Sequence, residues 1–222
     1  MKRGHLYVKI DVRDGSGSTN VPKVHSMKYQ EVVDRIVNLN DGIKAFWSKA
    51  DGWAPIEVAG LLTKSRLDWQ VSLSRCLQKW EHDPPTELYD GELILAWVNI
   101  GSLVEGSMML FLSVWYKDYK QNIDDEIKKN PKLKFKKPDE LRLQILREFF
   151  NKYVWHDGIE DFDWNTWVEN IQNRRNAIHA FKHRDIGDFK ELRRSVKIYL
   201  RFLRYINRRL IYPDDIYEPR EE

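Results

Sequence analysis

Residues 164–183 read WNTWVENIQNRRNAIHAFKH, and the expectations for the whole chain start from this stretch. Its apolar residues recur at three- and four-residue steps, which predicts an amphipathic helix with Asp163 as its N-cap. The apolar stripe consists of Trp164, Trp167, Val168, Ile171 and Ile178. The C-terminal end of the stretch gathers four polar or charged residues: Arg174, Arg175, Asn176 and His179.

Arg175 is unusual because it falls inside the apolar stripe, where an unpaired charge is very costly. Glu105 is an isolated acid in the most apolar segment of the chain, and it is the candidate partner. Alternatively, the stripe faces a second subunit and the arginine lines a shared cleft. On an unbroken helix, His179 would share a face with Arg175, while Arg174 would be splayed by about 140° from His179.

The remaining chain has the periodicity of an all-α protein. Helices are predicted over 28–49, 55–81, 91–117, 139–154 and 188–210, besides the one above. Gly42 is a possible break in the first, and Pro84 and Pro85 end the second. Gly101 and Gly106 would let another helix approach the third closely. We therefore predict a bundle of about six helices over 27–212, followed by a C-terminal tail over 213–222.

An N-terminal extension over residues 1–26 stands apart from this pattern. Residues 5–12 place Leu6, Val8, Ile10 and Val12 on one face at period two, which predicts a short β-strand. A single strand has no partner within the predicted bundle. It either pairs with a second copy, or the extension is an upstream segment that precedes a start at Met27.

Composition excludes several classes. The 222 residues are 42% hydrophobic, which indicates a folded domain, and the net charge of +3 does not by itself indicate nucleic-acid binding. The single cysteine, Cys76, excludes an internal disulfide, and the six histidines show no metal-ligand spacing, so no metal or cofactor is expected. Leu93–Tyr116 contains Asn99 and Glu105, which favours a buried helix over a membrane span. With no secretory signal visible, a cytoplasmic location is expected.

Cations cluster in two places. Residues 120–138 contain seven lysines and two prolines, and we interpret them as a basic loop that is either a solvated connector or a phosphate-contacting arm. In 188–210, a basic stripe runs beside an apolar one. Solvation is the default for such a stripe, yet it has no interleaved acid, so its members are candidate RNA-binding residues: Arg193, Lys197, Arg201, Arg204 and Arg208.

The group at the end of 164–183 suits RNA cleavage. RNA carries its own nucleophile, the 2′-hydroxyl, so cleavage needs a base for that proton and cations for the charge that gathers on phosphorus. Histidine suits the first role because it titrates near neutral pH. Arginine suits the second through its fixed set of donors. Arg174, Arg175, Asn176 and His179 are therefore the candidate catalytic residues, with Glu105 in support.

This cluster resembles the Arg-x(4–6)-His motif of the HEPN superfamily (higher eukaryotes and prokaryotes nucleotide-binding domain). Arg174 and His179 match with four residues between them, whereas the Arg-Asn pair common in the family starts at Arg175. Which arginine is the motif arginine stays open. Arg75 and His82 also have an allowed spacing, but they lack the adjacent Arg-Asn pair.

The resemblance implies a HEPN-like bundle, a homodimer whose two motifs meet in one cleft, and metal-independent cleavage of RNA. In that case His179 serves the 2′-hydroxyl or the leaving group, and Arg174 stabilises the phosphate. It also implies a toxin–antitoxin or phage-defence setting, with an antitoxin or other regulatory protein as partner. Phe181 stands where nucleotidyltransferase-silenced toxins of the family carry a tyrosine, so silencing by that route is not expected.

Three functions follow in order. The first is a metal-independent endoribonuclease, and the second is a catalytically silent HEPN-like module that binds RNA or a protein. The third is a helical scaffold without nucleic acid, in which His179 merely complements a helix C-terminus and Arg175 pairs with Glu105. In the same way, Trp155, Trp164 and Trp167 are expected to be core residues rather than platforms for bases.

Overall fold

The computed structural model describes residues 24–156, 162–179, 181, 183–214 and 217–221. These residues form helices and turns without any strand, so the predicted all-α class is confirmed for them. The strand predicted over residues 5–12 lies outside the described residues. The helices are α1 (Tyr29–Trp47), α2 (Ile56–Lys64), α3 (Leu67–Cys76), α4 (Tyr89–Val114), α5 (Tyr116–Lys129), α6 (Leu143–Tyr153), α7 (Trp164–Arg175) and α8 (Phe189–Asn207).

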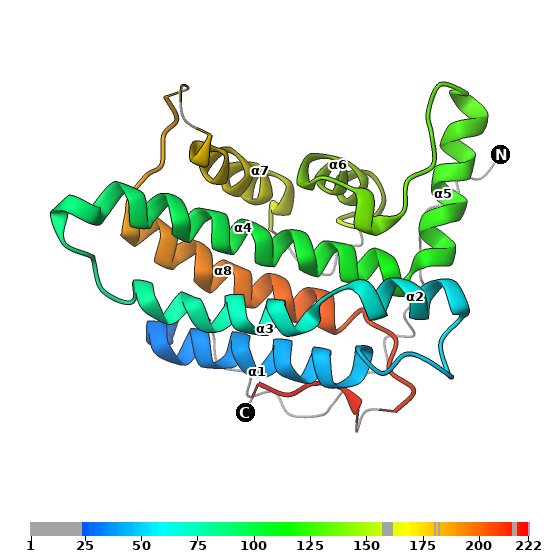
Figure 1. Ribbon diagram of the computed structural model, residues 1–222, viewed down its shortest axis with the longest axis horizontal. Helices are drawn as coiled ribbons and strands as arrows, with labels where there is room; N and C mark the ends of the chain where they lie inside the picture. The colour runs from blue at the N-terminus through cyan, green and yellow to red at the C-terminus, as the bar shows by residue number, and fades with distance from the viewer. Residues whose placement is uncertain (1–23, 157–161, 180, 182, 215–216, 222) are drawn as a thin grey trace.

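Helix α4 is the centre of the bundle (Figure 1). It packs against α3, α7 and α8, while α1 packs against α3 and α8 on the far side. Helices α6 and α7 lie along one side of α4, and α5 projects from its C-terminal end. Although Thr86–Val114 is long and apolar enough to cross a membrane, 61% of its most apolar window is buried inside the structure. Protein neighbours thus account for most of its apolar surface.

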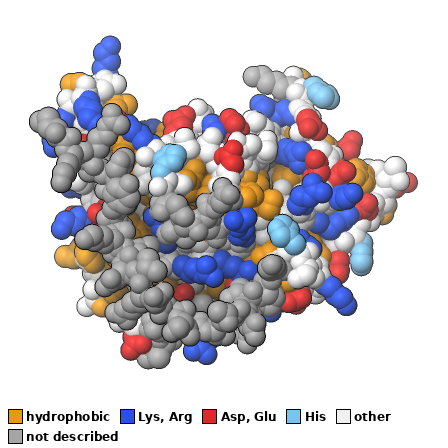
Figure 2. Space-filling view, turned by 180° about the vertical axis from the view of Figure 1, so that it is seen from behind, with side chains coloured by type: hydrophobic (Ala, Val, Ile, Leu, Met, Phe, Trp, Pro, Cys, Tyr) orange, Lys and Arg blue, Asp and Glu red, His pale blue; other side chains and the backbone are white. Residues whose placement is uncertain are grey.

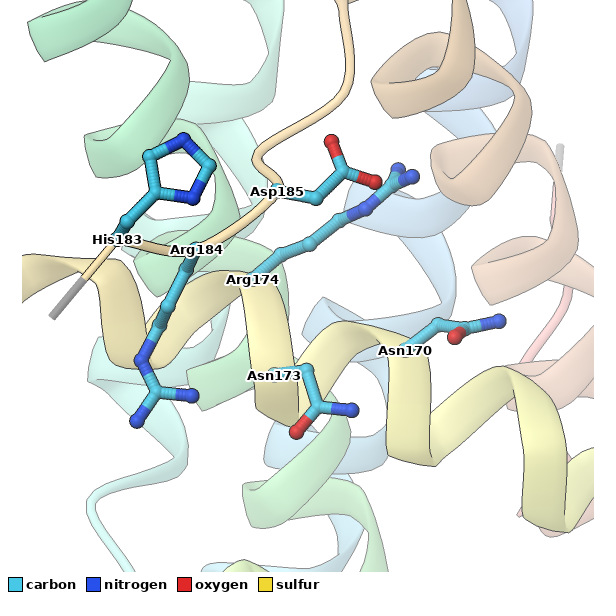
Figure 3. Close-up of a pocket in the computed structure, with 6 residues that line it drawn as sticks. All are labelled: Asn170, Asn173, Arg174, His183, Arg184 and Asp185. Carbon is cyan, nitrogen blue, oxygen red and sulfur yellow. The ribbon is translucent and has the colours of Figure 1, made fainter.

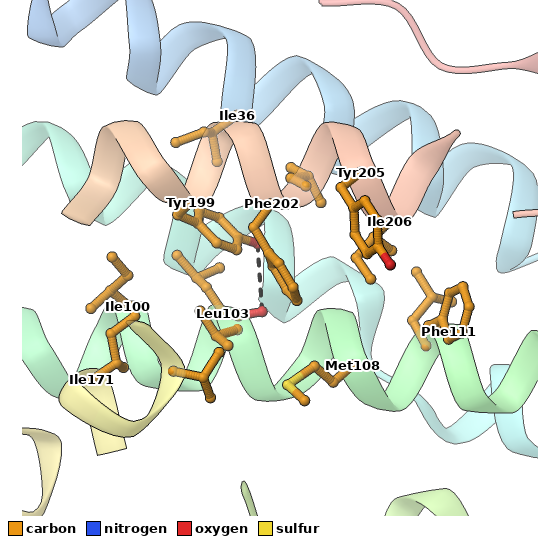
Figure 4. Close-up of a cluster of buried hydrophobic side chains, with 14 of the residues drawn as sticks. Ile36, Ile100, Leu103, Met108, Phe111, Ile171, Tyr199, Phe202, Tyr205 and Ile206 are labelled. Atoms are coloured by element: carbon orange, nitrogen blue, oxygen red, sulfur yellow. Dashed lines mark hydrogen bonds between the residues drawn. The ribbon is translucent and has the colours of Figure 1, made fainter. Parts of the chain in front are cut away.

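The core joins α4, α7, α8 and α1 (Figure 4). Ile100 and Leu103 of α4 meet Ile171 of α7 and Phe202 of α8, and all four are fully buried. The Tyr199 hydroxyl, also buried, lies 3.5 Å from the Leu103 carbonyl and 3.1 Å from the Ser107 hydroxyl. A buried hydroxyl without such partners would cost about 1–3 kcal/mol, so these bonds allow a polar group at the centre.

The helix predicted over 55–81 is divided, which corrects the prediction of one continuous helix. Arg66 separates α2 from α3 with a left-handed backbone, at φ 47° and ψ 48°. That conformation costs a non-glycine residue about 1–2 kcal/mol. The Arg66 guanidinium bonds Asp68 at 2.7 and 2.9 Å and lies 3.8 Å from the centre of the Trp69 ring. Because no glycine or proline lies at this point, the apolar periodicity of the sequence does not indicate the break between α2 and α3.

The basic loop predicted over 120–138 is also partly wrong, because α5 extends to Lys129. Its lysines alternate with acids at helical spacing: Lys128 pairs with Asp125 at 2.9 Å, and Lys129 pairs with Glu126 at 3.3 Å. Such pairs three or four residues apart support a helix. The irregular basic segment therefore begins only after α5.

The C-terminal tail docks on the bundle. The Glu221 carboxylate accepts hydrogen bonds from Arg204 of α8 and, at 3.0 Å, from Arg35 of α1. A Cβ on Gly42 would lie 2.7 Å from Pro219, so this glycine leaves room for the tail. Helix α1 runs through Gly42 without interruption, and the predicted break there is wrong. The tail thus belongs to the folded unit.

The Glu221 ion pairs should make stability depend on pH. Burial acts to raise the Glu221 pKa, but hydrogen bonds and charges from Arg204 and Arg35 outweigh it and hold the pKa below its ordinary value. A depressed carboxyl pKa contributes stability that is fully present above the unfolded-state value of about 4.3 and is lost as the pH falls through the folded-state value. Wild type should therefore lose more unfolding free energy than Glu221→Gln below about pH 5, measured by urea titration.

Glu87→Gln is the matched control, because Glu87 is an exposed acid, and it should follow wild type at every pH. Near neutral pH, Glu221→Gln should cost about 1–3 kcal/mol because two largely buried arginines lose the carboxylate that they share. Identical pH profiles for wild type and Glu221→Gln would contradict the docking of the tail.

Candidate functional site

Helix α7 begins and packs as its sequence predicts. The Asp163 carboxylate accepts a hydrogen bond of 2.9 Å from the Thr166 backbone N–H, and hydrogen bonding from Thr166 lowers the Asp163 pKa. Trp164, Trp167, Val168 and Ile171 are buried, so both tryptophans of α7 are core residues. The Trp164 ring packs on Phe202 of α8 at 5.2 Å. The N-cap and the apolar stripe up to Ile171 are confirmed.

The C-terminal end of α7 differs from the prediction. The α-helix ends at Arg175, Asn176–Ile178 form a single 3-10 turn (η5), and His179 follows in an extended conformation. Ile178 is half-exposed, so it does not belong to the apolar stripe. The expected one-turn relation between Arg175 and His179 is wrong, because the α-helical path stops between them. The His179 side chain is exposed, and its backbone N–H donates to the Asn176 carbonyl at 3.2 Å.

Arg175 has the partner inferred for it. Its guanidinium bonds the Glu105 carboxylate at 2.7 Å, and both side chains are largely buried, with 26% and 19% exposed. The arginine crosses α4 directly above Gly101, where a Cβ would lie 2.7 Å from Arg175 Cδ. The pair therefore depends on an acid and a glycine one turn apart on α4, which is the close approach predicted for Gly101.

Arg174 is held by a different set of groups. Its guanidinium bonds Glu191 of α8 at 2.8 Å and lies 4.7 Å from the centre of the Trp97 ring. Gly187, at φ 63°, makes room for this pair, because a Cβ there would come within 2.0 Å of the Glu191 carboxylate and 2.9 Å of Arg174. The two adjacent arginines are thus fixed separately, one over α4 and one between α4 and α8.

A surface hollow lies beside Arg174 (Figure 3). Its volume is about 330 Å³, and we call it the α7 hollow; Asn170, Asn173 and Arg174 of α7 line it together with His183, Arg184 and Asp185 of the α7–α8 connection. His179 is not among its lining residues. The sequence could have indicated that Asn170, Asn173 and Arg174 lie together, because residues three and four positions apart share one helix face. The path of the α7–α8 connection across that face could not be predicted from the sequence.

The predicted RNA-binding stripe of α8 is largely engaged within the chain. Arg193 bonds Asp83 at 2.7 Å, Lys197 donates to the Met27 carbonyl at 2.7 Å, and Arg204 bonds Glu221. Arg201 lies over the Phe162 ring at 4.8 Å, while Arg208 is exposed. On the face seen in Figure 2, Lys and Arg side chains are interspersed with Asp and Glu. RNA binding by this stripe stays a prediction, and it would require several of these contacts to open.

Comparison with protein-family models, with curated proteins and with solved structures gave no match. Among the residues that the structure describes, no group of three or more His, Cys, Asp or Glu side chains could hold a metal ion. The site is therefore interpreted from its own geometry.

Breaking the Glu105–Arg175 pair should destabilise the bundle. Glu105→Gln leaves a largely buried guanidinium without its counter-charge, and since both groups retain some exposure, we expect a cost of about 1–2 kcal/mol. Urea unfolding of the variant measures this cost.

The double variant Glu105→Gln/Arg175→Met serves as the control, because it removes both charges and should recover most of the loss. A Glu105→Gln variant as stable as wild type would show that this pair does not hold α7 on α4.

Proposed function

We propose that this protein is a metal-independent endoribonuclease of HEPN type, with its site at the C-terminal end of α7. One observation carries the proposal: a guanidinium held in place, that of Arg174, lies where the helix ends, and the exposed imidazole of His179 follows on the chain that leaves this end. A fixed cation and a solvent-accessible imidazole are the two groups that cleavage of RNA by its own hydroxyl requires.

The reaction follows from these two groups. The imidazole accepts the proton of the 2′-hydroxyl, whose oxygen attacks the neighbouring phosphorus. The P–O5′ bond breaks, the 5′-oxygen takes up a proton, and the other product ends in a 2′,3′-cyclic phosphate. Arg174 stabilises the negative charge on the non-bridging phosphate oxygens. A group whose pKa lies near neutral typically contributes 10²- to 10⁴-fold through such proton transfer.

The two arginines receive different roles. Arg175 is held by Glu105 at 2.7 Å, so we assign it to positioning the end of α7. Arg174 keeps the spacing of the motif and borders the α7 hollow, so we assign the phosphate to it. Asn176 opens η5, and its carbonyl accepts the His179 N–H, which sets where the imidazole leaves the helix.

The proposal includes a homodimer in which two α7 ends meet. Ile178 is 49% exposed and Phe181 is fully exposed, so exposed apolar residues both precede and follow His179 along the chain. Exposed apolar groups of this kind favour burial against a partner. The toxin–antitoxin or phage-defence setting and a regulatory partner protein belong to the same proposal and come from the family resemblance alone. The cytoplasmic location is part of the proposal too, and it rests on the expectation from the sequence.

A catalytically silent module that binds RNA or a protein is the second candidate. One observation favours it: both arginines of the motif already pair with carboxylates of the same chain, Arg174 with Glu191 and Arg175 with Glu105. Such a module would bind RNA without cutting it, so the same assay separates the two candidates.

Wild type should cleave single-stranded RNA in EDTA and leave 2′,3′-cyclic phosphate ends, detected by gel mobility and mass spectrometry. His179→Ala should lower the cleavage rate by about 10²-fold or more because the proton acceptor is lost.

His82→Ala is the matched control, since His82 is an exposed histidine in the connection between α3 and α4, and it should cleave like wild type. Circular dichroism should show all three proteins folded. Cleavage by His179→Ala at the wild-type rate would overturn the role of His179, and absence of cleavage by wild type would favour the silent module.

Phe181→Asp should convert the dimer to a monomer, because it places a charge in the proposed interface. Light scattering after size-exclusion chromatography measures the mass of each species. Ile56→Asp is the control, since Ile56 is 90% exposed on α2 and should leave the dimer intact. A wild-type monomer, or a Phe181→Asp dimer, would contradict this interface.

A further inference from the structure

The α7 hollow contains more chemistry than the proposed mechanism uses. It is lined by His183, Arg184 and Asp185 of the α7–α8 connection and by Asn170, Asn173 and Arg174 of α7. In Figure 3, Arg174 and Asp185 extend toward the same side, whereas His183 and Arg184 extend to other sides of the connection. Every lining side chain is polar or charged. A volume of about 330 Å³ is at the lower end of the range for small-molecule sites, which suits part of a nucleotide.

Arg174 already pairs with Glu191, so Arg184 is the guanidinium of the hollow that favours an anion. Asp185 is engaged, because its carboxylate accepts the Gly187 N–H at 2.9 Å. Arg184 is less satisfied: its Nε is buried and has no hydrogen-bond partner among the described residues. A buried donor left unpaired costs about 1–3 kcal/mol, and the cost is recovered when a ligand supplies an acceptor. Phosphate oxygens are good acceptors for guanidinium groups.

The two asparagines of the hollow favour a nucleotide unit over a simple anion as its ligand. Asn170 and Asn173 present carboxamides, which both donate and accept hydrogen bonds, on the α7 face that carries Arg174. Ribose hydroxyls and base edges require such groups, whereas a simple anion does not. The combination of guanidinium, imidazole and carboxamide groups therefore fits a phosphodiester with its attached nucleoside.

We infer that the α7 hollow is the phosphate subsite for single-stranded RNA, and that His183 is a second catalytic residue beside His179; this inference rests on the proposed function. Arg174 binds the scissile phosphate from the side away from Glu191, and Arg184, whose guanidinium extends to another side of the connection in Figure 3, binds a neighbouring phosphate of the RNA. His179 takes the 2′-hydroxyl proton, and the 2′-oxygen forms its bond to phosphorus as the P–O5′ bond breaks. His183, protonated beforehand, gives its proton to the departing 5′-oxygen.

Two histidines resolve a difficulty of the single-histidine site. One imidazole cannot accept the proton of the nucleophile and donate a different proton to the leaving group in the same step. His183 lies four positions after His179 and lines the hollow in which Arg174 is held, so it supplies the missing donor. The sequence motif at the end of α7 includes His179 but not His183.

Binding and cleavage are measured separately to test this inference. An RNA oligonucleotide with 2′-O-methyl groups throughout cannot be cleaved, and its binding is followed by fluorescence anisotropy at fixed salt. Arg184→Gln should weaken binding by about ten-fold, as loss of a phosphate contact does. Arg220→Gln is the matched control, because Arg220 is an exposed arginine of the tail, and it should bind like wild type.

Cleavage of the corresponding unmodified RNA in EDTA, under single-turnover conditions, tests His183. His183→Gln should lower the cleavage rate by about 10²-fold while changing RNA binding by less than about three-fold. The reason is that the substitution removes a proton donor and leaves the phosphate-binding arginines in place. An RNA whose 5′-oxygen is replaced by sulfur needs no proton on its leaving group. With that substrate, His183→Gln should recover most of the rate.

The outcomes separate this inference from the proposed function. If Arg184→Gln binds RNA as tightly as wild type, the hollow is not the phosphate subsite, even where His179→Ala abolishes cleavage. Full cleavage by His183→Gln, or no recovery with the sulfur-containing RNA, overturns the role of His183. If wild type binds RNA through Arg184 but does not cut it, the phosphate subsite stands, and the proposed cleavage and the role of His183 fail together.

Discussion

The ion pair between Arg175 and Glu105 is the constraint on which the site depends. Helix α4 is buried on most of its surface, and Glu105 is a charge at its contact with α7. That charge must be paired where water has little access. Gly101 lets the arginine cross α4 closely enough to reach it. The pair therefore sets the position of the last turn of α7 and, through it, where the polar end of the helix meets solvent.

The adjacent residues Arg174 and Arg175 of α7 therefore have different roles. Because Arg175 turns to α4, Arg174 lies about 100° further round the helix, beside Glu191 and the Trp97 ring. The α7–α8 connection must return over this arginine to begin α8, and Gly187 permits that close passage. His183 and Arg184 reach the hollow on the same return. A largely buried ion pair thus helps to place an arginine and a histidine in the lining of one surface hollow.

Much of this arrangement could be predicted from local signals in the sequence. Asp163 as N-cap, the buried tryptophans of α7 and the pairing of Arg175 with Glu105 each follow from spacing and from the cost of an unpaired charge. The division at Arg66 could not be predicted, because an ion pair and a ring contact stabilise a conformation that the residue itself disfavours. Helix α5 is hidden by its lysine content, because only the spacing of its acids and lysines indicates a helix. The hollow depends on the path of a connection, which carries no periodic signal.

The most direct test of the central claim is an NMR titration of the histidine imidazoles with the uncleavable 2′-O-methyl RNA. If the end of α7 receives the RNA, the ring signals of His179 and His183 should shift on binding, while those of His82 stay in place. His25 reports on the α8 stripe, since its carbonyl lies 3.4 Å from Lys197 Nζ, and its ring signal should also stay unchanged. Shifts confined to His25, with His179 and His183 unmoved, would contradict the account.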